Sequence, residues 1–211
     1  MTSQLLAYLT FTFILVITPG STTAVVVRNT LAGGRVAGLT AAAGAALGNT
    51  THATAAWLGL AIVFARWPMA MTALRAAGAL YLGWLGLGSL YRVARYTDGG
   101  LRIMTDGANG PAAPHRAGSF RQGLAVNVLN PAIATFYLVV VPSFLPANAS
   151  RWYFAALALI HITMAFVCHG LWAIAFDRLR QLLRPPLARR LVEGATAVAL
   201  IGLALRIARP G

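Results

Sequence analysis

Six apolar stretches, each long enough to cross a lipid bilayer as a helix, constrain this chain more than any other feature. A bilayer core of about 30 Å requires about 20 mainly apolar residues per helix. Charges seldom interrupt these stretches, because 58% of the 211 residues are hydrophobic and only 10% are charged. We therefore expect an all-α integral membrane protein with the lipid bilayer as a partner. Its six transmembrane helices should cover roughly 4–27, 36–65, 69–91, 121–146, 152–176 and 191–208.

The arginines predict which side of the membrane each connection faces. All 17 basic residues are arginines; twelve lie in the connections after the first, third and fifth stretches, and five lie on the opposite side. Cytoplasmic loops collect Lys and Arg, so we expect a multi-pass protein of the inner membrane with both termini on the outer, periplasmic side. A net charge of +13 would suggest nucleic acid in a soluble protein. Here its placement predicts topology and no nucleic-acid partner.

The longest polar segment, residues 92–119, divides the six stretches three and three. Its glycines, prolines and charges predict a flexible cytoplasmic linker. We expect one transporter domain, 1–211, with a first half at 1–91 and a second half at 120–211. An odd number of crossings in each half places the halves in opposite orientations, which is the 3+3 inverted repeat of many secondary transporters.

Helices one and four are predicted to be broken at proline, at Thr18-Pro19-Gly20 and at Asn130-Pro131. Proline has no N–H, so a backbone carbonyl one turn earlier is left unpaired at each break. In hydrocarbon such a group costs several kcal/mol, so both breaks should face the protein interior or a wet cavity. Exposed helix ends present N–H groups on one side and carbonyls on the other, which suits a zwitterion. A kink without further function is the alternative.

The candidate substrate-binding residues lie at the two breaks and on one face of the second stretch. His52 is the candidate proton carrier, and it shares a helix face with Asn49 three residues earlier. For His161 and His169, packing and a local hydrogen bond are as good an explanation as contact with a substrate or proton path. The full set is Pro19, Gly20, Ser21, Thr22, Asn49, His52, Asn127, Asn130 and Pro131.

Other residues predict packing rather than chemistry. The pairs Gly34–Gly38 and Gly44–Gly48, and the recurring Gly78, Gly83 and Gly86, predict close helix contacts. Asp177 and Glu193 stand beside arginines, which predicts surface ion pairs. A single cysteine, Cys168, and the absence of paired acids at membrane depth give us no reason to expect a metal site, a cofactor or catalysis.

Four segments resemble the LysE/RhtB family of amino-acid exporters over nearly the whole chain. They are TPG at 18–20, GGRVAGLTAAAGAALGNTTHA at 33–53, AAGALYLGWLGLGSLYR at 76–92 and SFRQGLAVNVLNPAIATFYLVVVPSFL at 119–145. The resemblance implies a six-helix inner-membrane homodimer that uses the proton gradient to export small solutes. Such solutes include lysine, arginine, threonine, homoserine and related compounds.

The chain departs from the family's usual pattern at charged positions. Asn49 stands where the family usually has an acidic residue, Ala132 stands where it usually has lysine, and Ser21-Thr22 replace Pro-Asn. We hypothesise that a complementary pair was lost together, because losing one partner alone would leave a buried unpaired charge. Such a protein could use His52 instead, carry a less charged substrate or act as a uniporter.

Alternating-access export of an amino acid or similar small amphiphilic solute is the function that these observations favour. A cation or metal transporter of a related superfamily is the first alternative, although carboxylates and thiolates are nearly absent at membrane depth. A non-transporting membrane scaffold is the second.

Overall fold

The computed structural model describes residues 2–59, 68–95, 116–146, 148–182 and 186–208. Over these residues the chain is helical with short turns and contains no strand, so the all-α prediction is confirmed. Most of the expected linker, 96–115, and the end of the second apolar stretch, 60–65, lie outside the described residues. The helices are α1 (Thr2–Ile17), α2 (Ser21–Trp57), α4 (Pro68–Arg95), α5 (Arg116–Val128), α6 (Pro131–Thr135), the π-helix η2 (Phe136–Val140), α7 (Val141–Ser143), α8 (Arg151–Leu182) and α9 (Pro186–Ala208).

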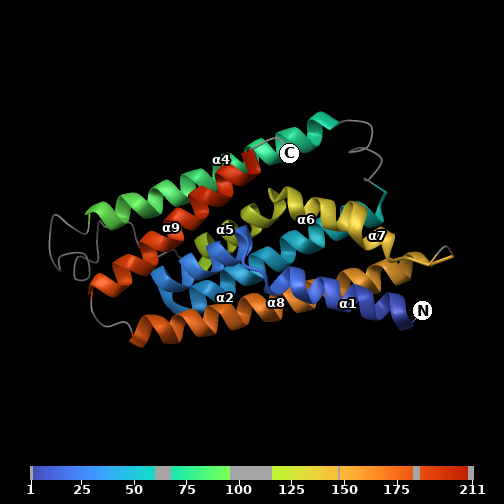
Figure 1. Cartoon of the computed structure of the whole chain (residues 1–211), viewed down its shortest axis with the longest axis horizontal. Helices are drawn as coiled ribbons and strands as arrows, with labels where there is room; N and C mark the ends of the chain where they lie inside the picture. The colour runs from blue at the N-terminus through green and yellow to red at the C-terminus, as the bar shows by residue number, and fades with distance from the viewer. Residues whose placement is uncertain (1, 60–67, 96–115, 147, 183–185, 209–211) are drawn as a thin grey trace.

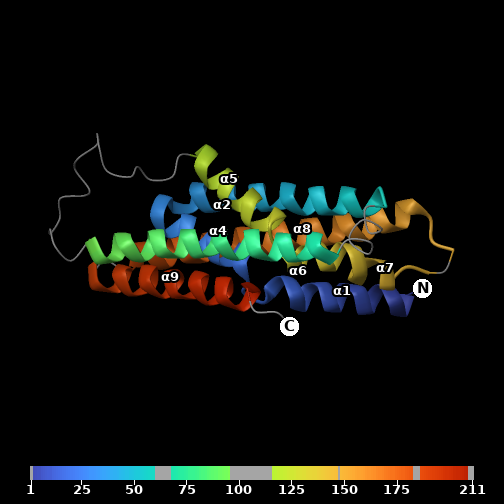
Figure 2. The same cartoon turned by 90° about the horizontal axis from the view of Figure 1, so that it is seen from above.

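The helices run along the long axis of the molecule (Figures 1 and 2). The amino terminus and α7 lie at one end, and the end of α4 and the start of α9 lie at the other. Among the described residues, one helix, Arg151–Arg180, is long and apolar enough by itself to cross a membrane. The number rises to three if the bent pairs α1–α2 and α5–α7 each count as one span. Six spans therefore stay a prediction.

Both predicted breaks are present. The chain leaves the helix between α1 and α2 at residues 18–20, and again between α5 and α6 at residues 129 and 130. The paired helices bend by 45° at the first break and by 55° at the second.

A third interruption, at Gly34, folds α2 into two arms. Gly34 has φ +76°, a left-handed conformation that glycine adopts readily. A Cβ added at Gly38 would lie 3.1 Å from the Cβ of Thr30, although residues eight apart in a straight helix are about 12 Å apart. The first arm (residues 21–33) and the second arm (residues 35–57) therefore pack against each other.

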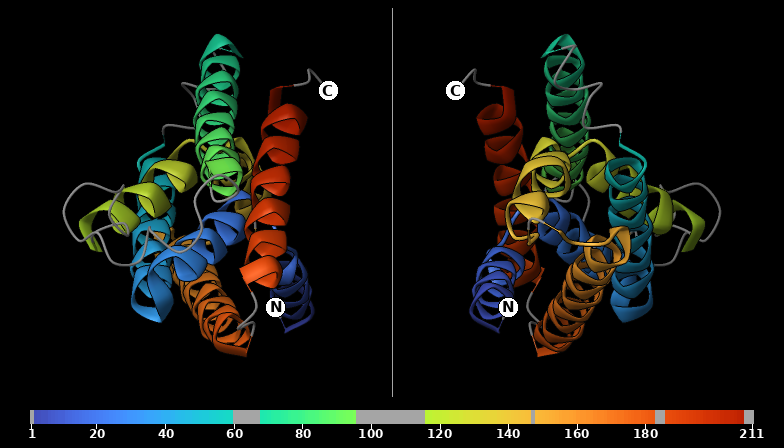
Figure 3. Two further views of the ribbon diagram at one scale, coloured as in Figure 1. Left: turned by 90° about the vertical axis from the view of Figure 1, so that its left-hand side faces the viewer. Right: turned by 90° about the vertical axis from the view of Figure 1, so that its right-hand side faces the viewer.

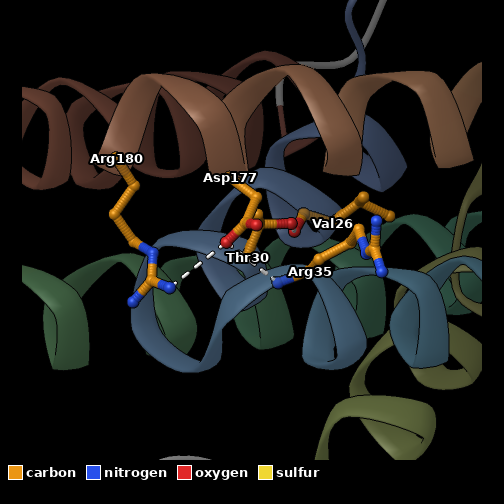
Figure 4. Close-up of polar contacts among 5 residues, drawn as sticks. All are labelled: Val26, Thr30, Arg35, Asp177 and Arg180. Atoms are coloured by element: carbon orange, nitrogen blue, oxygen red, sulfur yellow. Dashed lines mark hydrogen bonds and ion pairs between the residues drawn. The ribbon is translucent and has the colours of Figure 1, made fainter. Parts of the chain in front are cut away.

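Asp177 holds the turn between the two arms (Figure 4). Its Oδ1 accepts a hydrogen bond from the backbone N–H of Arg35 at 3.1 Å and pairs with Nη2 of Arg180 at 3.2 Å. A carboxylate at the first N–H groups of a helix is favourable because the helix dipole is positive there. The ion pair predicted for Asp177 is confirmed, and its bond to the second arm is an additional contact. The side chain of Glu193 lies outside the described residues.

Close glycine contacts fix α5 against the second arm. A Cβ at Gly44 would collide with the carbonyl of Phe120, and one at Gly123 would collide with the carbonyl of Ala41. On the other side of the molecule, α4 and α9 lie together (Figure 3), and a Cβ at Gly86 would lie 2.7 Å from Cγ1 of Ile201. Gly44 and Gly86 pack helices as predicted, and Gly123 is an additional close contact. The result is that α5 has almost no freedom to slide along the second arm.

Candidate solute-binding site

The second break is held by the side chain that precedes it. Asn130 is the N-cap of α6, and its Oδ1 accepts a hydrogen bond from the N–H of Ala132 at 3.0 Å. Pro131 follows at the first helical position, where its missing N–H costs nothing. The break is therefore a capped helix start rather than a bent continuous helix.

The first break has less side-chain support. Thr18 ends α1 by donating from both its N–H and its hydroxyl to the carbonyl of Ile14, at 3.2 and 2.7 Å. Gly20 is the N-cap of α2, and it has no side chain with which to cap. Pro19 is exposed. The start of α2 consequently depends on contacts with other helices.

The two breaks meet. Nδ2 of Asn130 donates to Oγ of Ser21 at 3.1 Å, which joins the first residue of α2 to the N-cap of α6 across 109 residues of sequence. Ser21 is buried, and Asn130 is partly buried. The first residue of α2 and the cap residue of α6 therefore lie together, whereas Thr18 and Pro19 of the first break are exposed, so the expectation that both breaks face the interior or a wet cavity is not confirmed for the first.

Asn127 links this junction to the second arm of α2. Its Nδ2 donates to Oδ1 of Asn49 at 2.9 Å, and its carbonyl lies 3.2 Å from Nε2 of His52. The same carbonyl accepts the N–H of Asn130 at 3.0 Å. The carbonyl that Pro131 was predicted to leave unpaired is therefore satisfied by a histidine from another helix and by the turn itself. We call Ser21, Asn49, His52, Asn127 and Asn130 the break cluster.

The predicted binding residues divide by position. The break cluster brings together five of them, with Pro131 buried beside it and Thr22 buried on the first turn of α2. Oγ1 of Thr22 and Oδ1 of Asn127 are buried without a hydrogen-bond partner among the described residues. Pro19 stands apart because it is exposed, and a Cβ at Gly20 would meet nothing within 4 Å.

The break cluster is polar and contains neither a carboxylate nor a guanidinium. It offers amide, hydroxyl, imidazole and backbone groups, which can donate and accept hydrogen bonds. Such a set can replace the hydration of a small zwitterion without binding an additional charge on its side chain. The hypothesis of a lost ion pair between positions 49 and 132 stays a prediction.

Tyr137, within the π-helix η2, forms a polar pair with His161 that the sequence did not predict. The hydroxyl of Tyr137 lies 2.7 Å from Nδ1 of His161, and both side chains are buried. The ring of Phe136 lies over that of His161, with centroids 4.2 Å apart. A tyrosine within an apolar run gives no signal by spacing. Short π-helical segments nevertheless often mark functional regions of helices.

Comparison with known proteins places the chain in a translocator family. The family model described as "LysE type translocator" matches residues 13–211. The chain is 27% identical to the uncharacterized membrane protein YrhP of Bacillus subtilis over 96% of its own length and 97% of that protein. It is 27% identical to a leucine efflux protein of Klebsiella pneumoniae (96% and 93% covered) and 25% identical to one of an Enterobacter species (95% and 93%). No solved structure matches it.

Proposed function

Because the chain belongs to the LysE family of translocators and is a membrane protein, we propose that it exports a neutral amino acid by alternating access around its two helix breaks. The observation that carries this proposal is the hydrogen bond from Asn130 to Ser21, which joins the two breaks. Discontinuous helices that meet in this way form the substrate sites of many secondary transporters.

The chemistry of the break cluster supports a substrate without a charged side chain. A cationic amino acid such as lysine carries an extra ammonium group, and burying it without an opposite charge is costly. The break cluster provides no such opposite charge, because it contains no carboxylate and Asn49 is neutral. Two of the relatives are named for leucine efflux. We therefore propose leucine and similar neutral amino acids as the substrate class.

The proposed arrangement in the membrane is six spans in two inverted halves, with the arginine-rich connections in the cytoplasm. In this arrangement the turn at Gly34 and the carboxyl-terminal end of α8 face the cytoplasm. His52 is the proposed proton carrier, because it is the titratable side chain of the break cluster and contacts the carbonyl of Asn127.

Counterflow in proteoliposomes tests the proposal. Vesicles loaded with unlabelled leucine should accumulate labelled leucine, whereas vesicles loaded with lysine or arginine should not. Failure to accumulate any neutral amino acid, together with quenching of an internal dye by an added divalent cation, would replace this proposal with the cation-transporter alternative. Failure in both assays would support the scaffold alternative.

A further inference from the structure

A second polar cluster lies on the first arm of α2, away from the break cluster. Oε1 of Gln122 accepts hydrogen bonds from Nη1 of Arg28 at 2.7 Å and from Nδ2 of Asn29 at 3.0 Å. Nε of Arg28 also donates to Oγ of Ser89 at 2.8 Å. We call Arg28, Asn29, Ser89 and Gln122 the Gln122 cluster. It joins α2, α4 and α5, three helices that are distant in sequence.

The two clusters are placed by one regular helix pairing. Ser21 pairs with Asn130, and Asn29 pairs with Gln122, so eight residues forward on α2 correspond to eight residues back along the chain through α5. The first arm and α5 are thus antiparallel, and two turns of helix, about 12 Å, separate the clusters. Halfway between them, Val25 and Val126 belong to the same apolar cluster.

The Gln122 cluster has groups that suit both ends of an amino acid. Arg28 is only partly buried, and its guanidinium matches a carboxylate in geometry and charge. Asn29 is fully buried. Its Nδ2 donates to Gln122 and to the carbonyl of Val25, so both N–H groups of the amide are used and Oδ1 remains as an acceptor. That Oδ1 has no hydrogen-bond partner among the described residues. One turn along α5, the fully buried Oγ of Ser119 also has none within the described part of the chain.

We propose that the Gln122 cluster is a loading site for the head group of the exported amino acid. Arg28 binds the α-carboxylate and Oδ1 of Asn29 accepts from the α-ammonium group. The apolar cluster that contains Val25 and Val126 lies between this site and the break cluster. The inference rests on the proposed function, because it assumes an amino-acid substrate. It also agrees with the proposed topology, in which the end of the first arm, next to the Gly34 turn, faces the cytoplasm, the side from which an exporter takes its solute.

Paired substrate analogues test the two contacts separately. Uptake of labelled leucine is measured in inside-out membrane vesicles, where the cytoplasmic face is accessible, with leucinamide or N-acetylleucine as competitors. Leucinamide lacks the carboxylate and N-acetylleucine lacks the ammonium group, so both should compete poorly with leucine in the wild type. We expect Arg28→Gln to reduce the discrimination against leucinamide about tenfold and leave N-acetylleucine rejected, since one charge-assisted contact is worth that factor or more.

Asn29→Leu should show the reverse pattern, with discrimination lost against N-acetylleucine only. Thr30→Val is the matched control, because Thr30 is equally buried but, among the described residues, its hydroxyl bonds only to the carbonyl of Val26 in its own helix. It should keep both discriminations. Discrimination unchanged in both Arg28→Gln and Asn29→Leu would overturn the loading site while leaving leucine export intact. Absence of leucine uptake by the wild type would instead refute the proposed function, and this inference with it.

A labelling measurement covers the case in which those variants do not fold. In a Cys168→Ser background, Ser119→Cys should react with a charged methanethiosulfonate reagent, and added leucine should slow the reaction. Ala173→Cys is the control: Ala173 is as buried as Ser119, but it lies in an apolar cluster with Val26 and Ala41, outside the Gln122 cluster, and should not react. A Ser119→Cys variant that transports leucine but does not react with the reagent would contradict a solute path between the first arm of α2 and α5.

Discussion

The two helix breaks meet, but they are built differently. At the second break Asn130 caps α6 with its own side chain, and the carbonyl of Asn127 is bonded by the turn and by His52. At the first break Pro19 is exposed, and the cap residue, Gly20, has no side chain. The second break is held by hydrogen bonds of its own residues, whereas the first depends on contacts with other helices, such as that of Ser21 with Asn130. We infer that the first break is the more mobile side of the site.

Asn130→Ala should have the largest effect, because Asn130 serves both breaks. The variant loses the cap of α6, worth about 1 kcal/mol, and also the bond to Ser21. We expect leucine counterflow to fall at least about tenfold, the factor that about 1.4 kcal/mol produces in a rate. The serine of Asn130→Ser can still cap α6 but is too short to reach Ser21, so its counterflow rate should lie between those of the wild type and Asn130→Ala. Wild-type rates in Asn130→Ala, with normal amounts of protein in the membrane, would make the second break purely architectural.

His52→Leu should have the next largest effect. It leaves the carbonyl of Asn127 with one hydrogen bond instead of two, and a lost bond of this kind costs about 1 kcal/mol. We expect a loss of roughly fivefold in transport and a lower thermal unfolding midpoint in detergent. His52→Gln keeps a donor, and recovery of the midpoint without recovery of proton-driven transport would assign His52 to coupling. Recovery of both would show that His52 only supports the backbone.

Ser21→Ala should be milder, since it removes an acceptor from Asn130 but leaves the cap of α6 in place. We expect transport to fall by about threefold, within the range of a neutral hydrogen bond. Thr22→Val is a useful comparison, because Thr22 is buried on the same turn and its hydroxyl has no partner among the described residues. A greater loss in Thr22→Val would show that the Thr22 hydroxyl contacts the solute.

Pro19→Ala should have the smallest effect. The residue is exposed, and α1 has already ended at Ile17, so an N–H at position 19 gains little. We expect transport within about twofold of wild type, because surface substitutions usually change stability by less than about 0.5 kcal/mol. A tenfold loss would contradict the asymmetry between the breaks and restore Pro19 to the binding site.

The sequence was informative wherever a local rule applied. Pro19 and Pro131 lack an N–H, so both interruptions could be predicted from single residues. The packing role of Gly44 followed from residue size in the same way. The turn at Gly34 could not be predicted, because GxxxG spacing is common to glycines that pack in a straight helix. Only a backbone angle distinguishes Gly34, and spacing carries no information about that angle.

Contacts between distant helices were beyond local rules. Gln122 and Asn29 are 93 residues apart, and their meeting depends on the register of α5 against the first arm of α2. The same holds for Tyr137 and His161, which are 24 residues apart: a hydrogen bond of the histidine was expected as an alternative to a transport role, but its partner could not be named. Asp177 was predicted to pair with a nearby arginine, and its bond to the backbone of Arg35 depends on the turn at Gly34.

The two-armed shape of α2 also has a consequence for biogenesis. Domains form from the amino terminus during synthesis, so both arms leave the ribosome before α5 exists. The helix α5 therefore packs against two arms that are synthesised before it. The carbonyl of Ala41 lies so close to position 123 that only glycine fits there. If the chain is produced as two separate fragments, divided within residues 96–115, the two should assemble into an active transporter, because α5 of the second fragment can pack against the arms of the first.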